Sequence, residues 1–398
     1  MDAVQAPIVP LLGDWIRETP GTISLGQGVV HYGPPRGAIE AARAAMDDPA
    51  THEYHDGAGV PALVERITAK LAAENGIVVG RDRRVMVTAG ANMAFLHAVL
   101  SITEPGDEII LPSPYYFNHD MAIEMAGCRA VRVPTDDRCQ LRLDAIRAAI
   151  TDRTRAVVTI SPNNPTGAVL SESSLRELNA LCGDRGLYHL TDEVYEYFVY
   201  GDARHASPGA FPGAAPHTIS MYSLSKAYGF AGWRIGYVVY PEHLDAAMMK
   251  SQDTVLICPP IVSQIAAAAA LDAGRAYCEP YVREYDGMRH LVLDALAGLG
   301  PLVEVPPADG AFYCFVRVRP DGQDRRDPSA KLSAERLDSL TLAERLIREH
   351  KVAVVPGAAF GVTDVCAFRV AFGALHTDTV AAGIGRLVGG LRAILHAS

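Results

Sequence analysis

The chain has 398 residues, of which 49% are hydrophobic and 21% charged, and its formal net charge is −10 at pH 7. This size and composition predict a globular protein of about two domains. The negative charge argues against nucleic acid as a partner, because phosphate backbones are bound by basic clusters. No apolar run approaches the roughly 20 residues that span a bilayer, so we expect no membrane association.

Three other sequence patterns are missing. The N-terminus lacks a basic segment followed by an apolar one, so we expect no signal peptide. Seven cysteines are scattered without a C-x-x-C pair, which indicates reduced thiols and a cytoplasmic protein. The 13 histidines form no H-x-x-x-H or similar pattern, so no metal site is predicted.

Residues 1–35 are rich in proline and glycine and are therefore expected to be irregular. Regular structure is predicted from residue 37 onward. Periodicity predicts helices over residues 37–47, 60–75, 91–101, 116–125, 141–150 and 171–186. It predicts strands over residues 85–88, 108–112, 130–134, 156–160, 188–195 and 218–223. Strand–loop–helix units at this spacing indicate an α/β fold with a mostly parallel central sheet flanked by helices.

The composition changes after residues 241–297, which are predicted to be largely helical. Short apolar segments (VEVP, FYCFVRV, VAVVP and CAFRVAF), a helix over 341–350 and a final helix indicate a separate α+β unit. The insert 319–339 is charged and poor in apolar residues, so a loop or a partly disordered segment is predicted there. We therefore expect a large domain over 45–297 and a small domain built from both termini, 1–44 and 298–398.

Lys226 lies in the motif SLSKAYGFAGWRIGY, which directly follows a predicted strand. Ser223, Ser225 and Arg234 lie within eight residues of it, and all three are good phosphate donors. A lysine beside a phosphate site is what a Schiff base to pyridoxal phosphate (PLP) requires. Taken alone, the motif is more often a surface loop with a solvated lysine, so the interpretation depends on the rest of the chain.

Residues that follow other predicted strands meet the further demands of PLP chemistry. Asp192 is the candidate carboxylate that keeps the pyridine nitrogen protonated. Asn164 and Tyr195 would donate to the ring oxygen, and Tyr116 would stack on the ring. Each also has a structural explanation: a capping aspartate, a turn or an ordinary core tyrosine.

Two features suit the anionic groups of a cofactor and a substrate. Gly90, Ala91 and Asn92 open a helix directly after a strand, which forms an anion site through its free N–H groups and its dipole. Arg369 lies in an apolar strand, where a charge is costly unless it is paired. A bidentate pair with a substrate carboxylate explains it, as does a structural salt bridge. Because ligands bind beyond the carboxyl ends of parallel strands, we expect these groups to meet.

Three motifs in order, SPNNPTG (161–167), TDEVYEYF (191–198) and SLSKAYGFAGWRIGY (223–237), resemble those of class I/II aminotransferases of PLP fold type I. The match runs from about Gly26 to the C-terminal helix. The resemblance implies that Lys226 holds PLP as an internal aldimine and moves the proton between the substrate α-carbon and the cofactor. It implies that Asp192 pairs with the pyridine nitrogen, that Asn164 and Tyr195 bond the ring oxygen and that Tyr116 stacks on the ring.

The resemblance also implies the residues that bind the other parts of cofactor and substrate. The phosphate ligands that the resemblance implies are Ala91, Ser223, Ser225 and Arg234, and the helix start described above adds Gly90 and Asn92. The expected substrate-binding residues are Gly28, Asn164 and Arg369. Tyr54 resembles a tyrosine that reaches the phosphate of a neighbouring subunit, which implies a homodimer with shared sites. The segment GVVHY (28–32) departs from the proline and aspartate of many relatives, so the lid over the substrate is expected to differ.

The implied reaction moves an amino group from an L-amino acid to a 2-oxo acid through a pyridoxamine form of the cofactor. The same scaffold also hosts elimination, replacement and carbon–carbon bond formation, as in aminocyclopropane-carboxylate synthase, and the motifs leave these alternatives open. A ligand-sensing regulator would need a DNA-binding module, for which there is no room before residue 20. A dinucleotide oxidoreductase would need a G-x-G-x-x-G after a strand, which the chain lacks.

Overall fold

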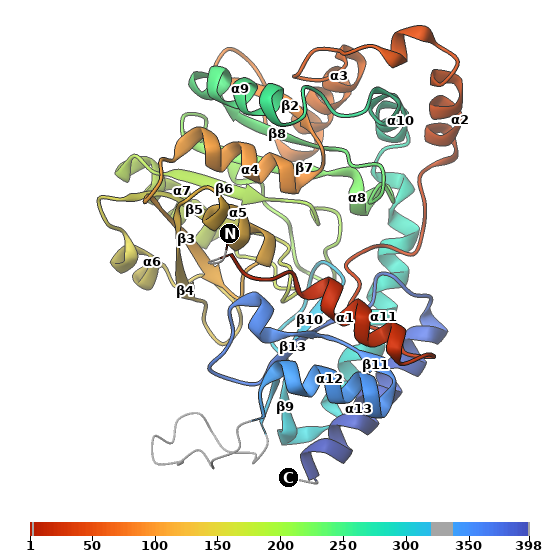
Figure 1. Ribbon diagram of the computed structural model, residues 1–398. Coiled ribbons are helices and arrows are strands. Elements are labelled where there is room, and N and C mark those ends of the chain that lie inside the picture. Colours follow the sequence, from red (N-terminus) through yellow and green to blue (C-terminus); the bar gives the residue numbers. More distant parts are fainter. Residues whose placement is uncertain (2–3, 320–336, 397–398) are drawn as a thin grey trace.

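The computed structural model describes residue 1, residues 4–319 and residues 337–396. Its largest sheet has seven strands (Figure 1). In spatial order they are β2 (Arg83–Thr88), β8 (Gly236–Pro241), β7 (Thr218–Ser223), β6 (Tyr188–Asp192), β5 (Thr154–Ile160), β3 (Glu108–Ser113) and β4 (Arg129–Pro134). The run from β7 to β4 is parallel, and β8 is antiparallel to both of its neighbours. The predicted α/β architecture is thus confirmed.

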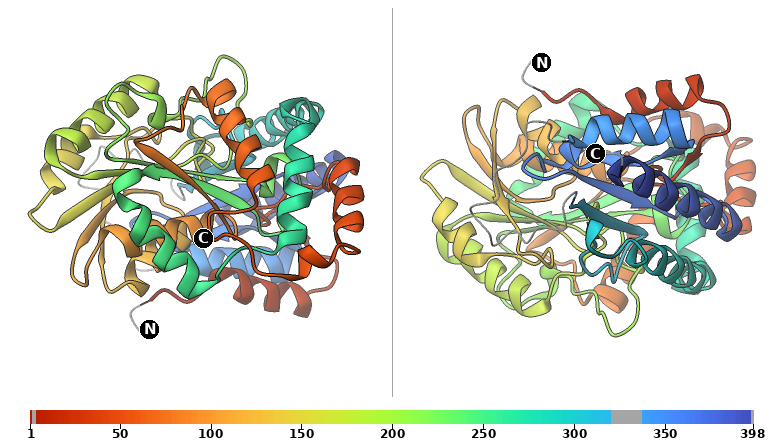
Figure 2. Two further views of the ribbon diagram at one scale, coloured as in Figure 1. Left: turned by 90° about the horizontal axis from the view of Figure 1, so that it is seen from above. Right: turned by 90° about the horizontal axis from the view of Figure 1, so that it is seen from below.

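Helices cover both faces of this sheet, as the views from above and below show (Figure 2). Alternate residues of a strand point to opposite faces, so Ile109 and Leu111 pack on one helical layer and Ile110 on the other. The first layer contains α4 (Ala91–Ile102), α5 (Phe117–Met125) and α9 (Asp245–Val255). The second contains α6 (Leu143–Ala149) and α7 (Glu172–Arg185). A sheet buried on both faces explains why its strands are continuous apolar runs.

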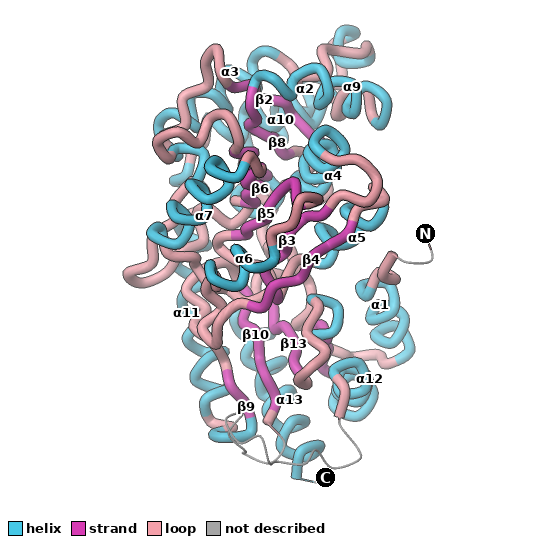
Figure 3. Tube along the Cα trace, turned by 90° about the vertical axis from the view of Figure 1, so that its left-hand side faces the viewer, coloured by secondary structure: helices cyan, strands magenta, loops and turns pink. Residues whose placement is uncertain are grey.

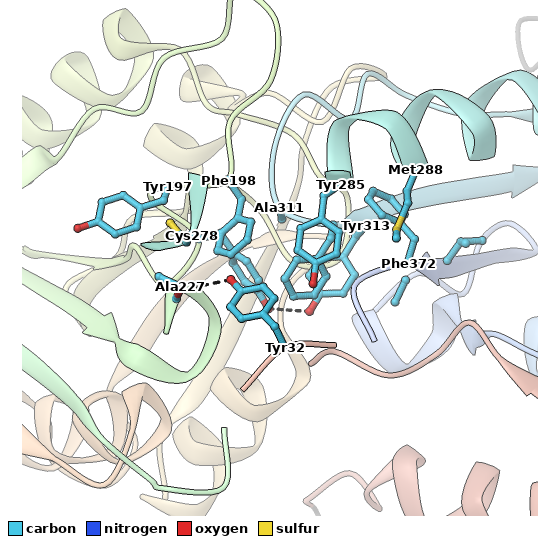
Figure 4. Packing of buried hydrophobic residues seen from close by; sticks show 14 of the residues in the cluster. Tyr32, Tyr197, Phe198, Ala227, Cys278, Tyr285, Met288, Ala311, Tyr313 and Phe372 are labelled. Carbon is cyan, nitrogen blue, oxygen red and sulfur yellow. Dashed lines mark hydrogen bonds between the residues drawn. The ribbon is translucent and has the colours of Figure 1, made fainter. Parts of the chain in front are cut away.

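Further helices pack beyond β2 and β8 and along the junction with the C-terminal part. They are α2 (Arg36–Ala45), α3 (Pro61–Lys70), α10 (Ile261–Asp272) and α11 (Glu279–Ala297). Their apolar residues share one buried cluster with Val85, Val87 and Val239 of the sheet. Figure 4 shows the aromatic centre of this cluster, where Phe198, Tyr285 and Tyr313 lie together.

A smaller antiparallel sheet lies toward the end of the molecule where the C-terminus is found (Figure 3). Its order is β12 (Val355–Pro356), β13 (Ala367–Ala371), β10 (Tyr313–Val318) and β9 (Val303–Glu304). Beside it, β1 (Ile23–Ser24) pairs in parallel with β11 (Val352–Ala353). The helices around these strands are α1 (Ile8–Glu18), α12 (Ser339–His350) and α13 (Thr377–His396).

The expectation of irregular structure over residues 1–35 is wrong for α1. Two prolines obscured this helix, but Pro7 is its N-cap and Pro10 lies in its first turn, where no N–H is needed. Ile8 and Leu12 are buried against apolar residues of α12, β12 and β10. This packing stabilises a helix whose composition alone does not favour it.

Three other differences concern the predicted elements. Strand β8 was not predicted, and it begins at Gly236, where a Cβ would lie 2.7 Å from the Tyr222 carbonyl oxygen. Strand β6 ends at Asp192 rather than at Tyr195, so the site residues after it lie on a turn. The helical stretch 241–297 is divided into α9, α10 and α11. Most of the predicted loop 319–339, residues 320–336, lies outside the described residues.

The two sheets are joined next to the carboxyl ends of the parallel strands. The Gly310 amide donates to the Gly167 carbonyl and the Ala311 amide to the Phe198 carbonyl, each at 2.8 Å. This connection holds β10 and β13 against the loops that follow β5 and β6. None of the helices within residues 4–319 and 337–396 has both the length and the apolar character needed to cross a membrane.

Candidate active site

A cavity of about 270 Å³ opens where the parallel strands end and the smaller sheet begins. Nearly all of the predicted site residues line it: Gly28, Ala91, Asn92, Tyr116, Asn164, Asp192, Tyr195, Ser223, Ser225, Lys226, Arg234 and Arg369. Gly90 lies directly beside the cavity, behind Arg234. Tyr54 does not reach the cavity of its own chain, and its side chain is 81% exposed.

Lys226 is positioned by the short helix α8 (Leu224–Ala227), which begins as soon as β7 ends. The Ser223 hydroxyl caps this helix by accepting from the Ser225 amide at 3.1 Å. The Lys226 ammonium donates to the Gly28 carbonyl. Burial, followed by the positive charges of Arg369 and Arg234, lowers the pKa of Lys226 from 10.5 to about 8. A neutral amine near physiological pH is what a nucleophile or a base requires.

One end of the cavity can bind an anion. The Ser223 hydroxyl donates to the Ser225 hydroxyl at 2.8 Å, and the start of α4 adds backbone N–H groups at Ala91 and Asn92. The Arg234 guanidinium is fixed by hydrogen bonds to two backbone carbonyls, those of residues 231 and 89. Such a set of hydroxyls, helix N–H groups and a guanidinium suits a phosphate.

Gly90 allows this arrangement. Its φ of +79° lies in the region that favours glycine, and a Cβ there would be 2.5 Å from Nη2 of Arg234. The guanidinium therefore packs directly on the backbone at the start of α4.

Asp192 is held by a residue that the motifs did not indicate. Its Oδ1 accepts from the Val194 amide at 3.1 Å, and its Oδ2 lies 3.3 Å from Nε2 of His119. The His119 ring stacks on Phe95 with 3.9 Å between ring centroids. His119 lies three positions after Tyr116, a spacing that places both on one side of α5. This spacing is the only signal in the sequence that could have indicated it.

Arg369 lies at the other end of the cavity and is 4% exposed. Its Nη1 donates to Oδ1 of Asn164 and its Nη2 to the Gly26 carbonyl, both at 2.7 Å. Its Nε is buried without a partner, and the ion pairs of the described residues give it no carboxylate. The guanidinium lies over the Tyr313 ring, 4.5 Å from its centroid. The structural salt bridge considered above is therefore not found among these residues.

Tyr195 has a partner that was not predicted either. Its hydroxyl lies 2.6 Å from the Tyr313 hydroxyl, deep in the cavity. Burial raises the pKa of Tyr195 well above its usual value, and the neighbouring Tyr313 acts in the same direction. Burial likewise raises the pKa of Tyr313 to about 12, so both phenols are neutral at physiological pH and either hydroxyl can be the donor in this contact. Tyr313 belongs to an apolar strand, so no pattern distinguished it from a core residue.

The remaining wall of the cavity is apolar and comes mainly from α1. Val9, Leu12, Gly13 and Ile16 line it from this helix, and Val29, Phe117 and Val355 continue the surface. Because residues 1–35 were expected to be irregular, this wall was not predicted.

Comparison with known proteins matches residues 20–387 to the family Aminotransferase class I and II. The chain is 32% identical to the aromatic aminotransferase ISS1 of Arabidopsis thaliana, over 98% of this chain and 95% of that protein. It is 35% identical to an aspartate aminotransferase of Pyrococcus abyssi, over 91% of this chain and 90% of that protein. Among solved structures, an aromatic aminotransferase from Pyrococcus horikoshii superposes with a TM-score of 0.85 and 34% identity, covering 96% of this chain and 99% of that one.

These relatives carry the names of amino-group transfer enzymes, so elimination, replacement and carbon–carbon bond formation are not favoured as alternatives. The family uses pyridoxal phosphate, as the resemblance of the three motifs implied. The chain belongs to the class I and II aminotransferases and is a transferase of amino groups.

Proposed function

We propose that this enzyme is a PLP-dependent aminotransferase that moves an amino group from an L-amino acid with an apolar or aromatic side chain to a 2-oxo acid. The central observation is the position of Lys226. Its amine, with a pKa of about 8, lies between an anion site and a buried arginine without a carboxylate.

The lining residues fit PLP on the chemistry of their donors. The hydroxyls of Ser223 and Ser225, the Arg234 guanidinium and the start of α4 would hold the phosphate. Asp192, backed by His119, would hold the pyridine nitrogen. The Tyr195 hydroxyl and the amide of Asn164 would contact the ring oxygen, and Tyr116 would contact the ring face.

The mechanism follows from what these side chains can do. Bound PLP supplies an electron sink for the pair that remains when the substrate loses its α-proton. The Lys226 Nζ would take that proton and hold it for the later protonation step, since with a pKa near 8 about one fifth of this amine is neutral at pH 7.4. Arg369 binds the substrate carboxylate, with its orientation fixed by Asn164 and Gly26.

The preference for an apolar side chain rests on the wall formed by α1. The cations that line the cavity are Lys226, Arg234 and Arg369, and each already has a role above. A second carboxylate, as in aspartate, would face Val9, Leu12 and the other apolar residues with no further cation among the described residues of the lining. The names of the Arabidopsis and Pyrococcus horikoshii relatives, both aromatic aminotransferases, agree with this preference.

The organisation of the enzyme is proposed along the same lines. Residues 45–297 form the large domain around the seven-stranded sheet, and 1–44 with 298–398 form the small one, supported by the pairing of β1 with β11. The enzyme is a homodimer in which the exposed Tyr54 reaches the partner's phosphate. It works in the cytoplasm, where its seven cysteines remain reduced.

The test is the visible absorption of the purified enzyme with PLP, before and after addition of single amino acids. Amino acids with apolar side chains should abolish the band of the lysine-bound cofactor and leave PLP in its amine form, identified by chromatography after acid release. Lys226→Ala should show no band and no turnover, whereas Lys250→Ala, at an exposed lysine of α9, should behave like the wild type. Multiple turnovers by Lys226→Ala would refute the proposal.

A further inference from the structure

A cluster of metal-ligating side chains lies outside the cavity. His31, Glu284 and His376 come from the loop after β1, from α11 and from the turn between β13 and α13. One ligand atom from each lies within 4.8 Å of the other two. Nε2 of His31 is 3.3 Å from Oε2 of Glu284, and the centroids of the two imidazole rings are 4.8 Å apart.

The hydrogen bonds around His31 fix which of its ring nitrogens carries a proton. The Tyr285 hydroxyl donates to the Gly373 carbonyl at 2.8 Å, so its single proton is used there. Nδ1 of His31, 3.0 Å from the same hydroxyl, must therefore donate to it. Nε2 of a neutral His31 then presents a lone pair to the Glu284 carboxylate. Two acceptors at this distance need a positive charge between them, either a proton or a metal ion.

The surrounding aromatic side chains hold the His31 ring in place. The His31 side chain is 7% exposed, and the rings of Tyr32, Tyr281 and Tyr285 meet it edge-on at 5.4–5.8 Å. Figure 4 shows Tyr32 and Tyr285 side by side, with the Tyr32 hydroxyl bonded to the Ala227 carbonyl. His376 is exposed, so its ring is free to turn toward an ion that enters from solvent.

We propose that His31, Glu284 and His376 form a binding site for a divalent cation of the zinc type. Two imidazoles and one carboxylate suit Zn²⁺, whereas Mg²⁺ and Ca²⁺ require more oxygen ligands. Tetrahedral coordination brings ligand atoms to about 3.4 Å from one another, so a small rotation of His376 completes the site. The bond from Nδ1 to Tyr285 is the outer contact that orients a metal-binding histidine.

A cation bound here would stabilise the loop after β1 and would take no part in the reaction itself. His31 does not line the cavity, but three residues before it the Gly28 carbonyl accepts from Lys226. The bound cation would therefore fix this loop to α11 and to the turn after β13. This inference does not depend on the amino donor or on the transfer reaction.

The experiment measures zinc binding by the untagged, PLP-loaded enzyme in metal-free buffer, in competition with a chromophoric chelator. We expect one Zn²⁺ per chain and a higher melting temperature when the ion is bound. His376→Asn should weaken binding by more than about tenfold, and Tyr285→Phe by about tenfold, because it removes the outer contact. The control His290→Asn, at an exposed histidine of the same helix, should leave the affinity unchanged.

Crystals soaked in zinc should give an anomalous peak between the three side chains. Absence of stoichiometric binding at about 100 µM free Zn²⁺, far weaker than the affinity of structural sites, would show that only a proton occupies the gap and would overturn the proposal. So would unchanged affinity in folded His376→Asn, or an anomalous peak located elsewhere.

Discussion

Arg369 donates from Nη1 to Oδ1 of Asn164 at 2.7 Å, although the two residues are 205 positions apart in the sequence. The contact joins β13 of the smaller sheet to the loop after β5 of the larger one. It fixes the plane of a buried guanidinium whose Nε has no partner among the described residues. The hydrogen bonds to Asn164 and Gly26 and the contact with the Tyr313 ring offset part of the cost of burying this charge, and a ligand carboxylate would offset more of it.

The first prediction follows from this geometry. Arg369→Lys should lower kcat/KM for the amino donor by about 100-fold or more, because a lysine cannot reproduce the two-pronged contact. The loss should be much smaller for the corresponding amine without a carboxylate. Steady-state kinetics on both compounds give the ratio of their kcat/KM values in each variant. Arg317→Lys, on the neighbouring strand β10 and paired with Glu304, is the control and should leave the ratio unchanged. Equal losses for both compounds would contradict the carboxylate role.

The second prediction concerns pH. The pKa of Lys226 is lowered to about 8, so its neutral fraction increases as the pH rises through that value. At pH 8 about half of this amine is neutral, compared with less than about 1% of an ordinary lysine. The rate at which apoenzyme combines with PLP, followed by visible absorption, should therefore rise with pH and level off above about 8. Because the charge of Arg369 contributes to the lowered pKa, Arg369→Met should move this midpoint upward. A rate still rising at pH 10 in the wild type would contradict the lowered pKa.

The third prediction separates backbone strain from the anion site. Gly90 and Gly213 share a φ of +79°, but a Cβ at Gly213 meets no atom within 4 Å, whereas one at Gly90 meets Arg234. Both alanine variants should lower the melting temperature, since this φ costs about 1–3 kcal/mol for other residues. Only Gly90→Ala should also weaken PLP binding, by about 10–100-fold, because it displaces the guanidinium. Equal PLP affinities in the two variants would show that the contact between Gly90 and Arg234 is unimportant for the cofactor.

The parts of the site that follow strands could be predicted from the sequence. Lys226, Asp192 and Asn164 each come directly after an apolar run, and parallel strands bring such positions to one edge of the sheet. The fold class followed from the same alternation. Strand β8 did not, because it is antiparallel and is hidden within a glycine-rich motif.

The residues that the sequence did not indicate act through tertiary contacts. His119 and Tyr313 are the partners of predicted residues, and no local pattern distinguishes a partner from a core side chain. His31 and His376 are far apart in the chain, so no spacing rule for metal ligands applies to them. Helix α1 was missed because its stability comes from packing on α12 and β12 rather than from helix propensity.

The last prediction tests α1 as the wall that selects the substrate side chain. Val9 lines the cavity and is 47% exposed, so it can carry a charge without unfolding the helix. Val9→Arg should raise kcat/KM for aspartate relative to phenylalanine by about tenfold or more, because a cation then faces the second carboxylate. Leu11→Arg adds the same charge to the same helix at an exposed residue outside the cavity lining. If both variants shift the ratio equally, the effect comes from the added net charge, and α1 does not select the side chain.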